Sequence, residues 1–229
     1  MNLLLGGYGR LGMELQKHLV CDTPTRQEYD ITKNVTFSTT YDNVILSAAF
    51  TDVPRAEINR LDVINTNIIG TKNIAERYFR SRIVYISTDY VYEGKYGNYK
   101  ESDLPKPFNF YGFSKLAGEA FMNLDKDLVI RTSFKPMNKW AFDAAFSDIY
   151  TSADYVDILA KDIAIVIKSD ITGIINVGTE RKSIYDLAIR RNPNVGRMSK
   201  NSIKTVNLPE DISMDISKLL IIKNKYGGS

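Results

Sequence analysis

The sequence is poor in the residues that build metal centres and covalent cross-links. Its 229 residues include one cysteine, Cys21, and one histidine, His18. A single cysteine cannot form an internal disulfide, which is typical of a protein in a reducing compartment. One Cys and one His also cannot supply a Cys/His metal cluster, so we predict no metal site. We expect Cys21 at the end of a buried strand and His18 on the surface of the first helix, where it cannot complete a Ser-His-Asp triad.

Long hydrophobic runs and a strong charge of one sign are absent as well. No stretch approaches the ~20 apolar residues of a membrane-spanning helix, and the apolar run Leu3–Leu5 is too short for a signal-peptide core. Thirty basic and 27 acidic residues give a net charge of +3, and the basic residues are scattered. We therefore predict a cytoplasmic protein that binds neither membranes nor nucleic acid.

What the sequence does contain is an alternation of short apolar runs and helical periods, which predicts parallel βαβ units. The predicted strands are 3–5, 44–46, 83–86, 128–131 and 174–177. The predicted helices are 11–19, 54–79 (with a break near 65–70), 111–124, 157–168 and 183–190. The fold class that follows is α/β, a Rossmann-type doubly wound parallel sheet with a small, shortened C-terminal lobe. We expect residues 1–133 to form the dinucleotide-binding domain and residues 134–229 a reduced substrate-binding portion that partly completes the sheet.

Three glycines follow the first strand in the pattern Gly-x-x-Gly-x-x-Gly, and a helix follows them. Gly6 permits a tight turn, Gly9 lets the backbone approach a pyrophosphate, and Gly12 lets the helix pack closely on the strand. The position between strand and helix is the context that supports a dinucleotide site rather than a turn without a ligand.

The residue that contacts the adenosine ribose is expected ≈ 20 residues after the glycines. That count falls near Arg26, which suits a 2′-phosphate and favours NADP. Asp22 lies a few residues earlier and is the acidic alternative, so NAD is the alternative cofactor. Asp30 and Ile31 could flank the adenine.

Tyr111 and Lys115 form a Tyr-x-x-x-Lys pair on one face of a predicted helix. A free phenol has a pKa of about 10, and a nearby ammonium lowers it, so this tyrosine could pass a proton to a carbonyl oxygen. Lys115 could also hold a ribose. Thr88 follows the strand 83–86 at its carboxyl end, where ligands bind in open parallel sheets, and its hydroxyl could polarise the same carbonyl.

These residues carry a family resemblance. The chain resembles extended short-chain dehydrogenases/reductases, and among them the dTDP-4-dehydrorhamnose reductases. The motifs that carry the likeness are Tyr29-Asp30-Ile31-Thr32, Ser47-Ala48-Ala49-Phe50-Thr51-Asp52, Ala56-Glu57, Asn67 to Asn73, Ser87-Thr88-Asp89-Tyr90-Val91-Tyr92, Tyr111 to Glu119 and Ile130-Arg131-Thr132-Ser133. The first ~135 residues match closely and the last 75 more loosely.

The resemblance implies roles for individual residues. Thr88, Tyr111 and Lys115 would be the catalytic set, and Asp89 and Tyr90 would approach the sugar. The cofactor site would include the glycine loop with Arg10, Leu11, Asp30, Ile31, Ala48, Ala49 and Thr51.

Two departures from the family concern the substrate. Phe134 stands where the family has a tryptophan, and the region between Ser133 and Asp157 is shorter. Five aromatic residues of the C-terminal portion could replace part of the missing wall or could form a core under a loop: Trp140, Phe142, Phe146, Tyr150 and Tyr155.

The activity implied is NADPH-dependent reduction of the 4-keto group of a nucleotide-linked 4-keto-6-deoxy sugar. One alternative is a non-catalytic NADP-binding subunit that resembles the beta subunit of methionine adenosyltransferase. Another is a sugar-nucleotide epimerase or dehydratase that retains NAD. The nucleotide, the sugar and the oligomeric state, including a homodimer, stay open.

Overall fold

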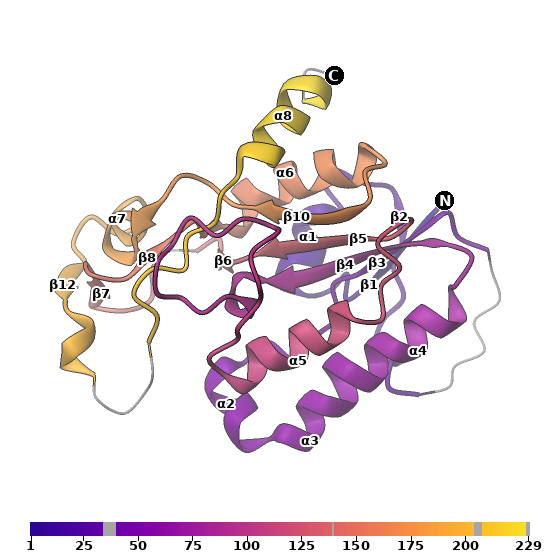
Figure 1. The fold of residues 1–229 in the computed structure, drawn as a ribbon, viewed down its shortest axis with the longest axis horizontal. Helices are drawn as coiled ribbons and strands as arrows, with labels where there is room; N and C mark the ends of the chain where they lie inside the picture. The colour runs from indigo at the N-terminus through magenta and orange to yellow at the C-terminus, as the bar shows by residue number, and fades with distance from the viewer. Residues whose placement is uncertain (34–39, 139, 204–207, 228–229) are drawn as a thin grey trace.

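Six parallel strands form the central sheet in the computed structural model, which describes residues 1–33, 40–138, 140–203 and 208–227 (Figure 1). In spatial order the strands are β10 (Gly173–Val177), β5 (Leu128–Thr132), β4 (Arg82–Thr88), β3 (Asn43–Leu46), β1 (Asn2–Leu5) and β2 (Cys21–Asp22). The order reverses at β1, with β2 on one side and β3 to β10 on the other. This is a Rossmann sheet, and the predicted fold class is confirmed.

The alternation of side chains along the strands builds a core on each face of the sheet. Leu4 of β1 belongs to the cluster that includes residues of α1 (Arg10–Leu15), α6 (Val156–Lys168) and α8 (Ser217–Tyr226). Its neighbours Leu3 and Leu5 belong to the opposite cluster, with residues of α4 (Gly70–Arg77). Figure 1 shows α6 and α8 on one side of the sheet and α4 and α5 (Phe110–Glu119) on the other. A hydrophobic layer therefore covers each face of the sheet, and the sheet is buried on both sides.

The segment between β3 and β4 is less regular than the single helix predicted over 54–79. It consists of α2 (Val53–Ile58), α3 (Arg60–Val63), a π-helical turn η1 (Ile64–Ile69) and α4. The helix is interrupted at Asn59, whose backbone leaves the helical region (φ −96°, ψ 49°). The predicted break near 65–70 corresponds to the π-helical turn. Within it, the buried Asn67 amide donates to Phe50 O (3.1 Å) and accepts from Phe50 N (2.7 Å), which ties the turn to the loop after β3.

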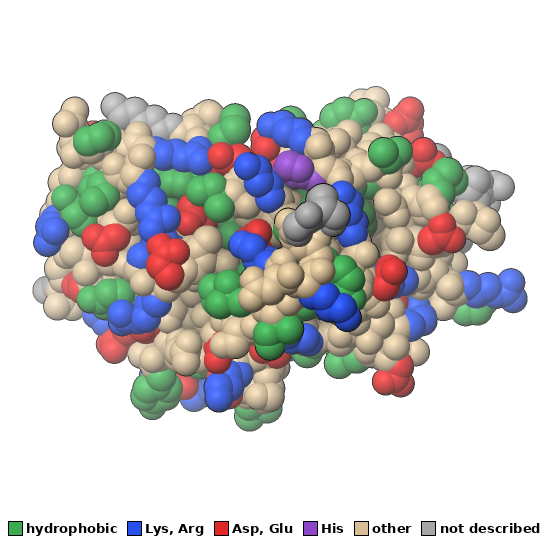
Figure 2. Space-filling view, turned by 90° about the horizontal axis from the view of Figure 1, so that it is seen from above, with side chains coloured by type: hydrophobic (Ala, Val, Ile, Leu, Met, Phe, Trp, Pro, Cys, Tyr) green, Lys and Arg blue, Asp and Glu red, His purple; other side chains and the backbone are tan. Residues whose placement is uncertain are grey.

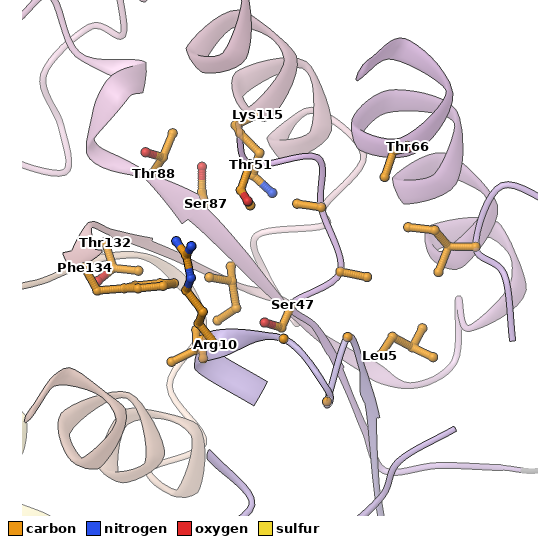
Figure 3. A pocket seen from close by; sticks show the side chains of 18 of the residues that line it. Leu5, Arg10, Ser47, Thr51, Thr66, Ser87, Thr88, Lys115, Thr132 and Phe134 are labelled. Carbon is orange, nitrogen blue, oxygen red and sulfur yellow. The ribbon is translucent and has the colours of Figure 1, made fainter. Parts of the chain in front are cut away.

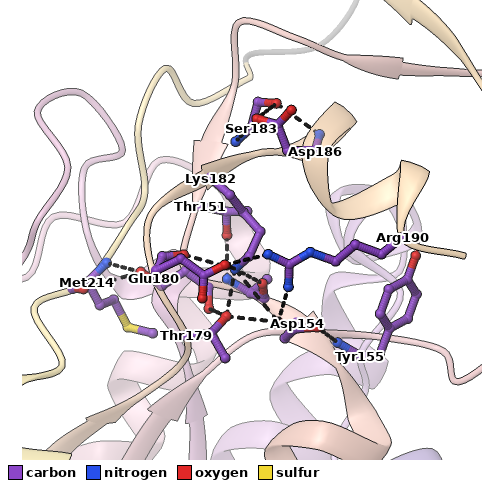
Figure 4. Close-up of polar contacts among 12 residues, drawn as sticks. Thr151, Asp154, Tyr155, Thr179, Glu180, Lys182, Ser183, Asp186, Arg190 and Met214 are labelled. Atoms are coloured by element: carbon purple, nitrogen blue, oxygen red, sulfur yellow. Dashed lines mark hydrogen bonds and ion pairs between the residues drawn. The ribbon is translucent and has the colours of Figure 1, made fainter. Parts of the chain in front are cut away.

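After β5 the chain forms three small two-stranded pairs beside the sheet. β6 (Phe134–Lys135) pairs with β9 (Asp154–Tyr155), β7 (Ala144–Phe146) with β12 (Gly196–Met198), and β8 (Tyr150–Thr151) with β11 (Lys182–Ser183), next to α7 (Ile184–Ile189). Figure 4 shows how this region is held together. The buried carboxylate of Asp154 accepts from Thr179 (2.9 Å) and Arg190 (2.9 Å), and the buried Lys182 donates to Thr179 (2.6 Å). This network fixes β9, and with it the strand β6 that leads away from the main sheet.

The surface carries both charge signs close together. Figure 2 shows Lys and Arg interspersed with Asp and Glu on the face above α6 and α8, where His18 is visible. His18 is half-buried and lies in the turn after α1, not within the helix as predicted. In the described part of the chain, no helix combines the length and apolar character needed to cross a bilayer.

Candidate active site

One large cavity, of about 670 Å³, opens at the carboxyl ends of the sheet strands. Its wall is formed by the glycine loop after β1, the loops after β2 and β3, the end of β4 with the short 3₁₀ turn η2 (Asp89–Val91), the start of α5, and the segment from β5 into β6. In Figure 3, Lys115 and Thr51 point into the space that Thr88 and Ser87 border, and Arg10 reaches toward it from the start of α1. The volume lies within the ≈ 300–1,000 Å³ typical of small-molecule sites.

The structure brings nearly all predicted site residues to this cavity. Those that line it are Gly6, Gly9, Arg10, Leu11, Arg26, Asp30, Ile31, Ala48, Ala49, Thr51, Thr88, Asp89, Tyr90, Tyr111, Lys115 and Phe134. Gly12 does not line it. The five aromatic residues proposed as a substitute wall do not line it either, and Tyr155 is buried with Ala153 and Leu187 in a small core instead.

The glycine loop is as tightly packed as its sequence suggests. Gly6 adopts φ +89°, and a Cβ there would lie 2.4 Å from Ala48 N. A Cβ on Gly12 would lie 2.3 Å from Gly6 O and 2.5 Å from the Gly7 Cα, so only glycine allows α1 to begin this close to the loop. Gly12 thus shapes the cavity from behind its wall.

The two candidate ribose ligands differ in their surroundings. Arg26 lines the cavity, is largely exposed, and lies 3.8 Å from the Asp30 carboxylate. Asp22 ends β2 outside the cavity, and its carboxylate accepts from the Tyr41 hydroxyl (2.9 Å). The cationic candidate therefore faces the cavity and the acidic one does not.

Tyr111 is placed by the start of α5. Asn109 caps the helix by accepting from Gly112 N (2.7 Å), and Glu57 accepts from Phe110 N (2.7 Å). Gly112 allows close packing, because a Cβ there would lie 2.2 Å from Tyr90 O. The Tyr111 ring meets the Tyr90 ring edge-on at 6.2 Å between centroids. Loop and helix together hold the phenol at the cavity wall.

The pKa of Tyr111 shifts opposite to our prediction. Burial raises the pKa of this phenol well above its usual value, and Asp89 raises it further, while a hydrogen bond with Thr88 partly offsets both. The expectation that the Lys115 ammonium makes the phenol more acidic is therefore wrong for this site, because desolvation outweighs any nearby positive charge. Tyr111 is a protonated phenol at neutral pH.

Lys115 is held over an aromatic ring. Its Nζ lies 4.1 Å from the centroid of the buried Tyr85 ring, and Tyr85 donates its hydroxyl hydrogen bond to Lys115 O (3.3 Å). A Cβ on Gly118, one turn after Lys115 in α5, would lie 2.2 Å from the Tyr85 hydroxyl. The glycine therefore makes room for the Tyr85 side chain. Burial lowers the pKa of Lys115 to about 7, and Glu119 partly opposes this shift.

Sequence reasoning missed several cavity residues. Ser87, Thr66, Thr132, Ser133 and Lys135 line the wall but were not assigned roles. Thr132 ends β5 and Ser87 is the last residue but one of β4, so the rule that placed Thr88 at a strand end applies to them as well. The available signal for Lys135 is its charge in the segment that follows the apolar strand 128–131. Among the described residues, no group of three His, Cys, Asp or Glu side chains is arranged to hold a metal ion.

Known proteins resemble the chain in both sequence and structure. A dTDP-4-dehydrorhamnose reductase from Aggregatibacter actinomycetemcomitans is 37% identical over 148 residues, which cover 58% of this chain and 50% of that protein. A methionine adenosyltransferase 2 subunit beta from Danio rerio is 45% identical over 56 residues, 24% of this chain and 17% of that protein. The chain thus spans about half the length of the first curated relative, and less of the second.

The similarity to solved structures covers nearly the whole chain. A hypothetical dTDP-4-dehydrorhamnose reductase from Sulfolobus tokodaii superposes with a TM-score of 0.81 and 30% identity, covering 96% of this chain and 94% of that one. The Bacillus anthracis dTDP-4-dehydrorhamnose reductase, solved in complex with NADP, superposes with a TM-score of 0.82 and 26% identity, covering 96% and 90%. The sequence model of the RmlD substrate binding domain matches residues 1–156, and the chain therefore belongs to that family.

Proposed function

We propose that the chain is an NADPH-dependent reductase acting on the 4-keto group of a nucleotide-linked 4-keto-6-deoxy sugar. The observation that carries the proposal is the convergence of Thr88, Tyr111 and Lys115 on the same cavity as the glycine loop. Reductases named for this activity are among the relatives of the chain, and one of them was solved with NADP.

The cavity has the features that such a cofactor needs. Glycines at positions 6, 7 and 9 leave the backbone of the loop after β1 accessible at one end of the cavity, where phosphates could approach it. Arg10 and Arg26 line the cavity with positive charge, and Arg26 would hold a 2′-phosphate. Asp30, Ile31, Ala48, Ala49 and Thr51 would line the adenosine and ribose positions. NAD is the alternative cofactor, and Arg26 favours NADP.

The chemistry that NADPH supplies when bound is a hydride for the carbonyl carbon. The residues of the chain manage the oxygen and its proton. Thr88 donates its one hydroxyl hydrogen to Asp89 Oδ1 and would redirect it to the carbonyl oxygen, while Tyr111 would transfer its phenolic proton to that oxygen. Tyr111 is protonated at neutral pH, as a proton donor must be, and the alkoxide left by hydride addition is basic enough to take the proton from a phenol. Lys115, whose Nζ lies over the Tyr85 ring, would bind the nicotinamide ribose.

The cavity residues not assigned to the cofactor or to proton transfer would contact the substrate. Asp89 and Tyr90 would approach the sugar, and Phe134 would offer a ring for stacking. We also propose the functional division predicted from the sequence, with residues 1–133 as the cofactor-binding domain and residues 134–229 as a reduced substrate-binding portion, of which Phe134 and Lys135 line the cavity.

Consumption of NADPH in the presence of nucleotide-linked 4-keto-6-deoxy sugars tests the proposal. A panel that varies the nucleotide (dTDP and UDP) and the sugar stereochemistry should identify at least one substrate, while a known reductase serves as the positive control. No oxidation of NADPH with any member of the panel, while the control reacts, would contradict the assignment.

The second candidate is a non-catalytic NADP-binding subunit, favoured by the short matches to methionine adenosyltransferase beta subunits. A binding module has no need of a cavity-facing phenol, threonine and lysine, which supports the reductase instead. Cofactor binding without turnover, together with a co-purifying partner protein, would favour the subunit. An epimerase or dehydratase would retain NAD, and the cofactor released on denaturation distinguishes it.

We further propose a cytoplasmic location and leave a homodimer as an open possibility. The half-buried Cys21 has no second cysteine in the sequence to pair with, which suits a reducing compartment. Size-exclusion chromatography with light scattering determines the oligomeric state.

A further inference from the structure

The cavity wall contains a cation to which the proposed reaction gives no role. Lys135 follows Phe134 in β6, and the pairing of β6 with β9 fixes the backbone at this position. Among the described residues, no carboxylate lies within 4.0 Å of its ammonium. The nearest aromatic contact is distant, with Nζ 6.0 Å from the Trp140 ring centroid. Lys135 therefore faces the cavity without a direct charged partner.

Asp89 is an acidic residue in the wall of the same cavity, and it directly follows the last residue of β4. Its side chain is buried, and its Oδ1 accepts a long hydrogen bond from the Thr88 hydroxyl (3.2 Å). Burial raises the pKa of Asp89 to about 7, with Thr88, Lys135 and Ser133 opposing that shift. Thr88, Ser133 and the Tyr90 backbone supply hydrogen bonds to this carboxyl group, and a carboxylate offers about four lone-pair sites, so one acceptor position is left.

The spacing between these two groups is informative. Both side chains line the same cavity, yet their charged atoms are more than 4.0 Å apart. A buried carboxylate without a close cation is costly, and a polar group inserted between the buried Asp89 and the half-buried Lys135 would satisfy both. A hydroxyl is well suited to this position because it donates to a carboxylate and accepts from an ammonium at once.

We propose that Lys135 and Asp89 together bind one substrate hydroxyl, on a ring carbon beside the carbonyl that Thr88 and Tyr111 hold. The inference rests on the proposed function, because it takes the reacting carbonyl to lie at Thr88. Asp89 directly follows Thr88 in the chain and lines the same cavity, so a group held by Asp89 lies next to the carbonyl position. Lys135 is thus a specificity-determining residue, and the substrate class is an α-hydroxy ketone rather than any 4-keto sugar.

Equilibrium binding to the NADP-loaded protein tests the proposal without needing turnover. The probes are dTDP-rhamnose and its 3-deoxy analogue, measured by calorimetry with the wild type and Lys135→Met. Removing either the hydroxyl or the ammonium should weaken binding about tenfold or more, the usual loss for a hydrogen bond to a charged group. Because both changes remove the same interaction, the analogue should bind the variant no more than about twofold worse than it binds the wild type.

The controls separate this idea from a general loss of structure and from the proposed function. Lys161→Met removes an exposed lysine of α6 and should change neither affinity. Asp89→Asn should reproduce the loss of hydroxyl discrimination, while NADPH affinity stays within about threefold of the wild type. Additive losses, or equal affinity of the wild type for both probes, would overturn the role of Lys135. Absence of NADPH oxidation by a wild type that discriminates the probes would instead refute only the reductase assignment.

Discussion

The buried ion pair between Glu119 and Arg131 gives a quantitative prediction about stability. Arg131 Nη2 lies 2.7 Å from Glu119 Oε2, and Arg131 Nε donates to Glu119 Oε1 at 3.1 Å, a two-point contact. Ser87 donates to the same carboxylate at 2.5 Å, and Tyr92 accepts from Arg131 at 3.0 Å. Both partners are buried, with 2% of Arg131 and 8% of Glu119 exposed.

Glu119→Gln leaves the Arg131 charge buried without its partner. Removing one partner of a buried ion pair lowers the free energy of unfolding by about 3–5 kcal/mol. Replacing both partners by apolar residues of similar size changes it little. For a chain of this size, that loss corresponds to roughly 6–20 °C in melting temperature. Because Glu119 raises the pKa of Lys115, the same change should also lower that pKa below its present value of about 7.

Urea unfolding of the free protein measures the effect. Glu76→Gln is the matched control, because it breaks the exposed Lys72–Glu76 pair, whose net value is below about 1 kcal/mol. The double variant Glu119→Leu/Arg131→Met should recover most of the stability. A loss below about 1 kcal/mol for Glu119→Gln, or a double variant less stable than the single one, would refute the reasoning.

Three further predictions concern the cofactor site. Gly12→Ala should lower NADPH affinity, measured by fluorescence titration, at least tenfold, because its Cβ would lie 2.3 Å from Gly6 O. The control Gly196→Ala, outside the cavity, should leave the affinity unchanged. Tyr85→Leu removes the ring beneath the Lys115 ammonium and should weaken NADPH binding about 3- to 30-fold, while Tyr85→Phe keeps the ring and most of the affinity; equal losses would argue against the cation–π contact. NADPH should bind more tightly at pH 6 than at pH 8.5, since Lys115 is an ammonium only below its pKa of about 7, and calorimetry should detect proton uptake; Lys115→Met should bind weakly with a flat pH dependence.

The main strands were predictable because each is a short apolar run buried on both faces. The strand order was not, because β1 lies between β2 and β3 only through contacts that are distant in the sequence. The two-residue strands such as β2 are too short to give a period. The helix α8 was missed because Leu219 to Ile222 are consecutive apolar residues without helical spacing.

The members of the site were predictable from motifs, but their electrostatics were not. Tyr111 and Lys115 are four residues apart on a helix, which suggested a direct effect of one on the pKa of the other. The contact that holds Lys115 comes from Tyr85, 30 residues away in β4, and the groups that affect Tyr111 are Asp89 and Thr88. Burial of Tyr111 decided the direction of its pKa shift, and no repeating pattern in the sequence predicts how deeply a side chain at a cavity wall is buried.

The central claim, that the Tyr111 phenol gives its proton to a substrate carbonyl, is tested most directly by comparing wild type and Tyr111→Phe in NADPH oxidation with dTDP-4-dehydrorhamnose. The wild type should consume NADPH, and the variant should lose at least about 100-fold in kcat, the usual contribution of a general acid, while its NADPH affinity changes by no more than about threefold. A variant whose kcat stays within about tenfold of the wild type would contradict the claim.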